Sequence, residues 1–270
     1  LELPRVLSHS DLNAARLPIP PQPHLKSLVS DNKTICIMQD KYIIHFYNYM
    51  VIILLKNVEW KISNTFVNYD FAISEMQKRI IKIKNNTDNE LVWLLEHPSI
   101  YTAGTSAKEE DLINNQVEIR HTGRGGEWTW HGPGQRVIYV MLNLKKRLPD
   151  VKAYVNALEE WIILTLEDFN IKGVRIQNKP GVWVNNNQKG YDKIAALGVR
   201  ITSWVSWHGV SINLNPNLDE FKNIVPCGIQ DGGVTSFYNL KNQISFEELD
   251  YFLNKNFIKV FGDKSLFKFN

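Results

Sequence analysis

The sequence contains little of what marks several protein classes, beginning with cysteine. Only two cysteines, Cys36 and Cys227, occur in 270 residues. That is too few for a disulfide framework and indicates a reducing, cytoplasmic location. No charged start followed by an apolar core is present, so no secretory signal peptide is expected. One mostly apolar stretch, Tyr42–Leu55, falls short of the roughly 20 residues that span a bilayer, and we expect a buried strand or an interfacial segment there.

A strong excess of charge of one sign is absent as well. The net charge is +3, and residues 1–57 account for +2 of it. The remaining residues carry 25 Lys and Arg against 24 Asp and Glu, and so neutral a body gives no reason to expect a nucleic-acid partner. Apolar residues make up 44% and charged residues 22% of the chain, which is typical of a soluble globular protein.

Neither common phosphate-binding loop is present, since the chain has no G-x-x-x-x-G-K-[ST] and no G-x-G-x-x-G that opens a helix. Its glycine-rich stretch is Arg124–Gln135, which reads RGGEWTWHGPGQ and precedes the strand-like run Val137–Leu142. A long turn is the plain interpretation, but turns rarely combine Trp, His and Arg, so a ligand-binding loop is favoured. The guanidinium of Arg124 would have close access to a ligand, and replacing it is predicted to impair activity more than stability.

Apolar periodicity and turn residues predict an α+β protein. Helices are predicted over Tyr69–Ile83 and over Pro149–Asn170, with Pro149 in the first turn and Gly173 ending the helix. The Ser245–Glu248 capping box begins a last helix. Because helices and strands do not alternate strictly, a doubly wound sheet is not expected. Strands are predicted over Glu90–Glu96, Gly181–Val184, Lys193–Ile201 and Trp207–Leu214.

Residues 1–49 are interpreted as an extension, and residues 50–270 as one folded domain. The first 30 residues are rich in proline and poor in periodicity, so we predict that they are poorly ordered. Met50 begins the run Met-Val-Ile-Ile-Leu-Leu, which would make a normal first strand.

Two residues are candidates for catalysis. Cys227 lies between a proline, which fixes φ before the thiol, and a glycine that leaves its N–H open to a substrate oxygen. A buried, inert cysteine explains these residues equally well. Lys193 heads an apolar strand, where a solvated end residue is the plain interpretation. If Lys193 were held against the cysteine, loss of water would let a neutral amine take the thiol proton.

The histidines do not predict a metal site. His131 and His208 each precede a glycine, but no third ligand follows at a recognised spacing. His97 and His121 are interpreted as loop residues.

These motifs together resemble those of the lipoyl(octanoyl) transferase family, which moves octanoyl from acyl carrier protein to lipoyl domains. One motif alone would be weak, but several occur in the same order over about residues 58–260. The matching segments are Arg124–Gln135, Lys193–Arg200, Ser206–Gly209 and Pro226–Gly228, with Tyr101–Thr105 and Val234–Ser236 also similar.

The resemblance implies a single α+β domain in which a mixed β-sheet with flanking helices surrounds an acyl tunnel, as in lipoate and biotin protein ligases. It implies that Cys227 is the nucleophile that accepts the acyl group and that Lys193 activates its thiol. The substrate-binding residues it implies are Arg124, Gly125, Gly126, Glu127, Trp128, Thr129, Trp130, His131, Ala196, Leu197, Gly198, His208, Gly209, Val210 and Ser211.

The resemblance also implies the reaction partners. Octanoyl-acyl carrier protein would be the donor, and the acceptors would be lipoyl domains of 2-oxoacid dehydrogenase complexes and the glycine cleavage H protein. No cofactor, metal, nucleic acid or membrane is expected, and the protein is expected to be a monomer. Two alternatives stay open: an ATP-dependent lipoate–protein ligase, and a catalytically silent acyl-binding protein of the same fold.

Overall fold

The computed structural model describes residues 58–147, 149–186, 190–225 and 232–262, together with the backbone of two strands near the N-terminus. These strands, β1 (Lys26–Ser30) and β2 (Lys33–Ile37), pair antiparallel. They belong to a unit that ends at Tyr49, and a second unit begins at Met50. Neither strand is among those predicted from the sequence. The predictions for Tyr42–Leu55 lie outside the described residues.

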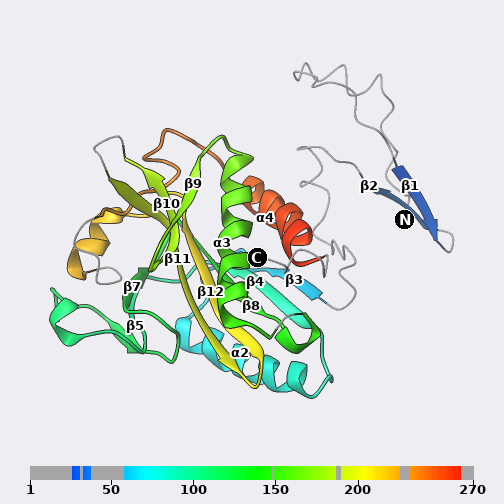
Figure 1. Cartoon of the computed structure of the whole chain (residues 1–270), viewed down its shortest axis with the longest axis horizontal. Coiled ribbons are helices and arrows are strands. Elements are labelled where there is room, and N and C mark those ends of the chain that lie inside the picture. The colour runs from blue at the N-terminus through cyan, green and yellow to red at the C-terminus, as the bar shows by residue number, and fades with distance from the viewer. Residues whose placement is uncertain are drawn as a thin grey trace. The chain divides into compact units, whose positions relative to one another are not determined.

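A seven-stranded mixed sheet forms the centre of the second unit (Figure 1). The outer pair β3–β4 is parallel, and every other neighbouring pair is antiparallel. The predicted strands are confirmed, mostly with longer bounds. In sheet order the strands are β3 (Val58–Ile62), β4 (Glu90–Leu95), β8 (Gln135–Met141), β12 (Val205–Asn213), β11 (Tyr191–Thr202), β10 (Lys179–Asn185) and β9 (Gly173–Ile176).

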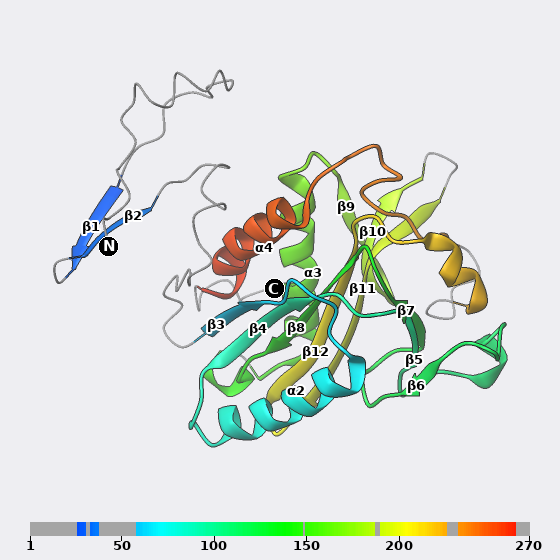
Figure 2. The ribbon, with the colours of Figure 1, turned by 180° about the vertical axis from the view of Figure 1, so that it is seen from behind.

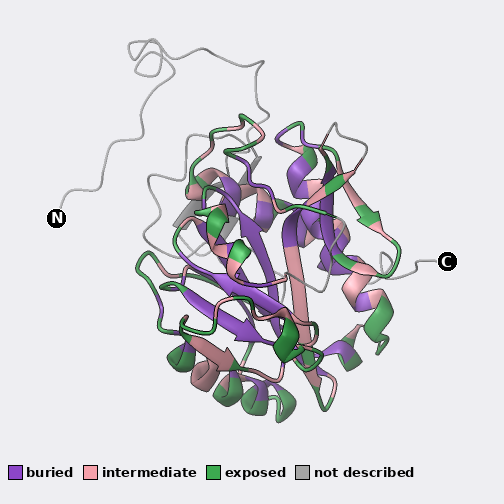
Figure 3. Cartoon of the chain, turned by 90° about the vertical axis from the view of Figure 1, so that its left-hand side faces the viewer, coloured by how far each residue is buried: buried purple, intermediate pink, exposed green. Residues whose placement is uncertain are grey.

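Both faces of this sheet are covered by helices, as Figures 1 and 2 show. Alternate side chains of a strand point to opposite faces, so Val92 and Leu94 pack with α3 and α4, whereas Trp93 packs with α2. The central strands β4, β8 and β12 are therefore buried along their whole length (Figure 3). The helices are α2 (Tyr69–Lys84), α3 (Val151–Glu167) and α4 (Phe246–Phe261).

The helix ends differ in part from prediction. The capping box at Ser245 is present, since its side chain accepts from the N–H of Glu248 and the Glu248 side chain accepts in return. The N-cap of α3 is Asp150, so Pro149 precedes the helix instead of lying in its first turn. Helix α3 ends at Glu167, and Gly173 opens β9. The side chain of Asp150 accepts from the N–H of Ala153, and this cap sets the start.

A second, three-stranded sheet carries the glycine-rich stretch. Its order is β6-β5-β7, with β5 parallel to β6 and antiparallel to β7. Residues Trp128–His131 are thus a strand instead of part of a long loop, because β5 offers them a partner edge. The bounds are β5 (Ile100–Ala103), β6 (Ile119–His121) and β7 (Trp128–His131), and the short 3-10 helices are η2 (Glu109–Asp111), η3 (Leu144–Lys146) and η4 (Leu218–Asn223). None of the helices in the described part of the chain is long and apolar enough to cross a membrane.

Candidate active site

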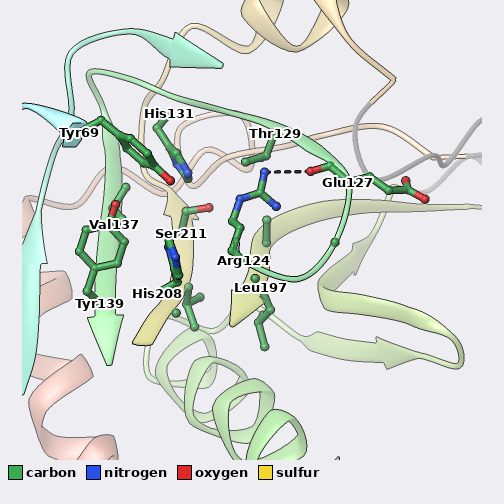
Figure 4. Close-up of a pocket in the computed structure, with 15 residues that line it drawn as sticks. Tyr69, Arg124, Glu127, Thr129, His131, Val137, Tyr139, Leu197, His208 and Ser211 are labelled. Carbon is green, nitrogen blue, oxygen red and sulfur yellow. Dashed lines mark hydrogen bonds between the residues drawn. The ribbon is translucent and has the colours of Figure 1, made fainter. Parts of the chain in front are cut away.

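A pocket lies where strands β7, β8, β11 and β12 approach the start of α2 (Figure 4). Most of the substrate-binding residues predicted from the sequence line it, although they come from three separate motifs. Its lining consists of Tyr69, Arg124, Gly126, Glu127, Thr129, His131, Val137, Tyr139, Ala196, Leu197, Gly198, His208, Gly209, Val210 and Ser211.

Three of the predicted substrate residues do not line the pocket. Trp128 and Trp130 alternate along β7 with the pocket residues Thr129 and His131, so their indoles point to the opposite face. There they join the small core of the three-stranded sheet. Their Nε1 atoms donate to Lys108 O at 2.7 Å and to Ser99 Oγ at 2.9 Å, respectively. The third, Gly125, connects the loop to β11 by donating its N–H to the carbonyl of Val199 at 2.9 Å.

Arg124 lies in the pocket wall, but its guanidinium is engaged by the protein itself. Nη2 donates to Thr102 O at 2.7 Å, to Thr102 Oγ1 at 2.8 Å and to Glu127 O at 2.8 Å. Only 6% of the residue is exposed. Figure 4 shows its bond to Glu127, which closes the glycine-rich turn. The close contact of this turn with Gly104 also requires glycine, since a Cβ there would meet Gly126 O at 2.1 Å. Arg124 therefore ties the loop to β5 while it lines the pocket, and its contact with substrate stays a prediction.

Three pocket residues were not predicted as site residues: Tyr69, Val137 and Tyr139. Each fits the apolar pattern of its helix or strand, so the sequence marks it as core. What brings them to the pocket is the sheet register, in which Tyr139 pairs with Gly209, and the packing of the first turn of α2. No local signal distinguishes them from buried structural residues.

His97 is in a loop, as predicted, yet it is completely buried. Its Nδ1 lies 2.6 Å from Val67 O, so it must carry the proton, and Nε2 then accepts from the Tyr139 hydroxyl at 2.7 Å. Burial lowers the pKa of His97 to about 4, and burial raises that of Tyr139 well above its ordinary value. Both groups are uncharged at neutral pH. His121 was predicted in a loop but ends β6, where it is exposed.

His131 is held by a chain of amides. The amide nitrogen of Gln135 donates to Asn213 Oδ1 at 2.9 Å, so its oxygen accepts from His131 Nδ1 at 2.7 Å. The other ring nitrogen is left as an acceptor. Burial, with a smaller effect of the neighbouring His97, lowers the pKa of His131 to about 3. Tyr69 stacks near this ring with centroids 6.3 Å apart, and Figure 4 shows the two side chains pointing toward each other.

His208 contributes a second neutral imidazole. It lies in β12 with φ at +57°, which is an uncommon conformation for a residue other than glycine. Its Nε2 is buried without a hydrogen-bond partner among the described residues. Burial lowers its pKa to about 3. Within the described ranges, no group of three or more His, Cys, Asp or Glu residues could hold a metal ion.

Lys193 is buried, so the interpretation as a solvated end residue was wrong. It is 6% exposed, and its Nζ has no hydrogen-bond partner among the described residues. Its Nζ lies 4.7 Å from the ring centroid of Trp183. The Lys193 backbone pairs with the later segment of the chain, from its N–H to Gly233 O at 2.9 Å and from Thr235 N–H to its carbonyl at 3.0 Å. Cys227 lies outside the described residues.

Comparison with known proteins places this chain in a family. Residues 68–258 match the model of the lipoyl protein ligase A/B catalytic domain. The chain belongs to the lipoyl protein ligase A/B family. Octanoyltransferases are among its relatives: the protein of Bartonella tribocorum is 51% identical, covering 76% of this chain and 87% of its own. That of Parvibaculum lavamentivorans is 52% identical, covering 77% and 94%.

Solved structures of lipoate protein ligases share the fold. The bipartite lipoate protein ligase of Thermoplasma acidophilum superposes with a TM-score of 0.57 at 11% identity, covering 76% of this chain and 84% of that one. A lipoate-protein ligase A bound with ATP gives a TM-score of 0.57 at 14% identity, covering 76% and 86%. The α+β fold with a mixed sheet and flanking helices, and the family resemblance itself, are thus confirmed.

The neutral histidines of this lipoyl protein ligase A/B domain make its stability depend on pH. The unfolded chain binds a proton at His97 near pH 6.5, whereas the folded protein does so only near pH 4. The contribution of the neutral His97 to the free energy of unfolding is therefore complete above about pH 6.5 and is lost as the pH falls toward 4. A difference of this size corresponds to about 3 kcal/mol. Urea unfolding between pH 7 and pH 4 should show the loss.

Replacement of His97 by Gln should flatten this part of the pH dependence. His121→Gln is the matched control, because His121 is exposed and lies outside the pocket. An acid slope that is the same in wild type and His97→Gln would contradict the assignment of the buried, neutral imidazole.

Proposed function

We propose that this protein transfers an octanoyl group from a carrier-bound thioester to the ε-amine of a lysine in a lipoyl domain. The protein is an acyltransferase that forms an acyl-enzyme on Cys227. The observation that carries the proposal is that residues of three sequence motifs line one pocket. One of its walls is β11, the strand in which Lys193 is buried. The names of the relatives, octanoyltransferases, support octanoyl as the acyl group that is transferred.

The chemistry of the pocket suits an uncharged acyl chain. Val137, Leu197 and Val210 supply apolar surface. Burial keeps the neighbouring imidazoles of His131 and His208 neutral, so they add no charge at neutral pH. Each buried CH₂ of a substrate contributes about 0.8 kcal/mol, or roughly a factor of four in affinity. Neighbouring chain lengths are therefore discriminated only modestly.

The reaction takes place in two steps. The Cys227 thiol gives its proton to the neutral Lys193 amine, and the thiolate attacks the thioester carbonyl. A new carbon–sulfur bond forms, the bond to the carrier's sulfur breaks, and that sulfur takes the proton from Lys193. In the second step the acceptor amine attacks the acyl-enzyme, the amide forms, and the proton lost by the amine returns the Cys227 thiolate to a thiol. The exchange of thioesters is near balance and amide formation is favourable, so ATP is not consumed.

Intact-mass spectrometry after incubation with octanoyl-acyl carrier protein tests the proposal. The wild type should gain one octanoyl group without ATP and should pass it to a lipoyl domain added afterwards. Cys227→Ala should gain none, whereas Cys36→Ala, the control for the other cysteine, should behave as wild type. Modification that requires free octanoate and ATP would instead identify a lipoate ligase. No modification under either condition would identify a silent acyl-binding protein.

A further inference from the structure

A buried carboxylate lies beside the candidate catalytic lysine and has no part in the reaction described above. Glu159, on α3, is 6% exposed, although carboxylates are seldom so deeply buried. It does not line the pocket. Its Oε1 accepts the backbone N–H of Gly181 in β10 at 3.1 Å. This hydrogen bond links α3 to β10, which pairs with β11, the strand that carries Lys193.

Gly181 is the link between Glu159 and the lysine. Its φ of +131° is a backbone conformation that side chains rarely adopt. A Cβ at this position would meet Lys193 Cε at 3.1 Å and Lys193 Cδ at 3.3 Å. The lysine stem therefore lies directly over the Gly181 backbone, whose N–H is held by Glu159.

The strand pairing at this place is also irregular. Val182 pairs with Ala195 and Trp183 pairs with Lys193, so one residue of β11 is left without a partner between them. Such a bulge changes the direction of a side chain and is frequent near active sites. Here Lys193 lies on the side where its Nζ faces the Trp183 ring. The Glu159–Gly181 bond fixes β10 directly before the bulge.

The groups around Glu159 limit the effect of burial on its carboxylate. Burial raises the pKa of Glu159 above its ordinary value, and the Gly181 N–H, Arg175 and Lys193 reduce that rise by favouring the ionised form. Arg175, from β9, lies 3.3 Å from Glu159 Oε2 and also pairs with Glu160 at 2.6 Å. Lys193, from β11, is within electrostatic range but is not hydrogen-bonded to the carboxylate.

We propose that Glu159 is a positioning residue for Lys193: it fixes the Gly181 backbone under the lysine stem, and its negative charge stabilises the ammonium. This inference rests on the proposed function, in which Lys193 takes the proton of Cys227. When the Cys227 thiol gives its proton to Lys193, the lysine becomes an ammonium. The negative charge of Glu159 lowers the free energy of that ammonium, and the effect is larger in the interior than in water. Glu159 therefore increases the fraction of Cys227 that is present as the nucleophilic thiolate.

The test is the pH profile of alkylation by iodoacetamide, read at the Cys227 peptide by mass spectrometry so that Cys36 does not interfere. Glu159→Gln keeps the shape of the side chain and an oxygen for Gly181 but removes the charge. We expect the apparent pKa of alkylation to rise by about one unit, with roughly tenfold slower reaction at neutral pH. The KM for octanoyl-carrier protein should stay unchanged, because Glu159 is outside the pocket.

Glu160→Gln is the matched control, since it removes a carboxylate from the same helix and from the same Arg175 without touching Gly181. Its profile should equal that of wild type. Glu159→Asp keeps the charge but is one CH₂ too short to keep its bond to the Gly181 N–H, so its apparent pKa should also rise, and this variant tests the positioning role even if Glu159→Gln does not fold. A wild-type profile in either variant overturns the inference.

The failure of the inference can be told from the failure of the proposed function. A wild-type protein that gains no octanoyl group from the carrier contradicts the proposed function, whatever the profile of Glu159→Gln. A wild type that becomes acylated, together with an unaltered profile in Glu159→Gln, removes only the role of Glu159.

Discussion

Replacing Lys193 by alanine is expected to slow the acylation of Cys227 by about 10²- to 10⁴-fold, the usual contribution of a positioned acid or base. The structure supports this because the Lys193 Nζ is buried without a hydrogen-bond partner among the described residues. A charged amine in such surroundings is poorly solvated, and a neighbouring thiolate would stabilise it. Rapid-quench acylation by octanoyl-carrier protein, followed by intact mass, measures the rate.

Three further results would make the case for Lys193 specific. Lys172→Ala, which removes an exposed lysine between α3 and β9, should leave the rate unchanged. Cys227→Ala should abolish the acyl-enzyme, and adding Lys193→Ala to it should cost nothing more, since no nucleophile remains to be activated. The apparent pKa of Cys227 alkylation should rise in Lys193→Ala. If it stayed the same, Lys193 would not be the activating group, and His131 or His208 would have to be tested.

Replacing Arg124 by alanine is expected to lower stability and activity together. The guanidinium donates to the carbonyl oxygens of Thr102, Glu127 and Gly125, and its removal takes these hydrogen bonds away from the interior of the loop. The cost of such a loss is about 3 kcal/mol. For a domain of this size, that lowers the melting temperature by about 6–12 °C. Differential scanning calorimetry and the acylation assay, run on the same preparation, measure both effects.

Arg120→Ala is the matched control for this variant. Arg120 lies four residues earlier, and its ion pairs with Asp70 and Glu118 are at the surface, where such pairs contribute little. Its melting temperature should change by only about 1–2 °C. An Arg124→Ala protein that melts like wild type but loses acylation would show that Arg124 serves the substrate and not the loop.

The sequence by itself determined the elements with regular periodicity. The apolar stripe from Tyr69 to Ile83 reproduces α2 to within one residue, because burial of one helix face imposes the 3.6-residue repeat. The capping box at Ser245 is equally local and is present as predicted. The four collinear motifs identified the family, since each combines residue types that ordinary turns and strands seldom bring together.

Only the tertiary structure decided which side chains of those motifs reach the pocket. Trp128 and Trp130 stand in the same motif as His131, yet the two-residue alternation of β7 turns them to the other face. Arg124 has the donors of a ligand-binding residue, and only the fold shows that the nearby strand β5 supplies acceptors for its guanidinium.

The same holds for residues that come together from distant parts of the chain. Tyr139 and His97 are 42 positions apart and meet through one hydrogen bond, while Glu159 and Gly181 are 22 apart. A sequence pattern records how a residue relates to its neighbours along its own helix or strand. It does not record the register between strands or the seating of a helix on a sheet, and these depend on packing across the whole core.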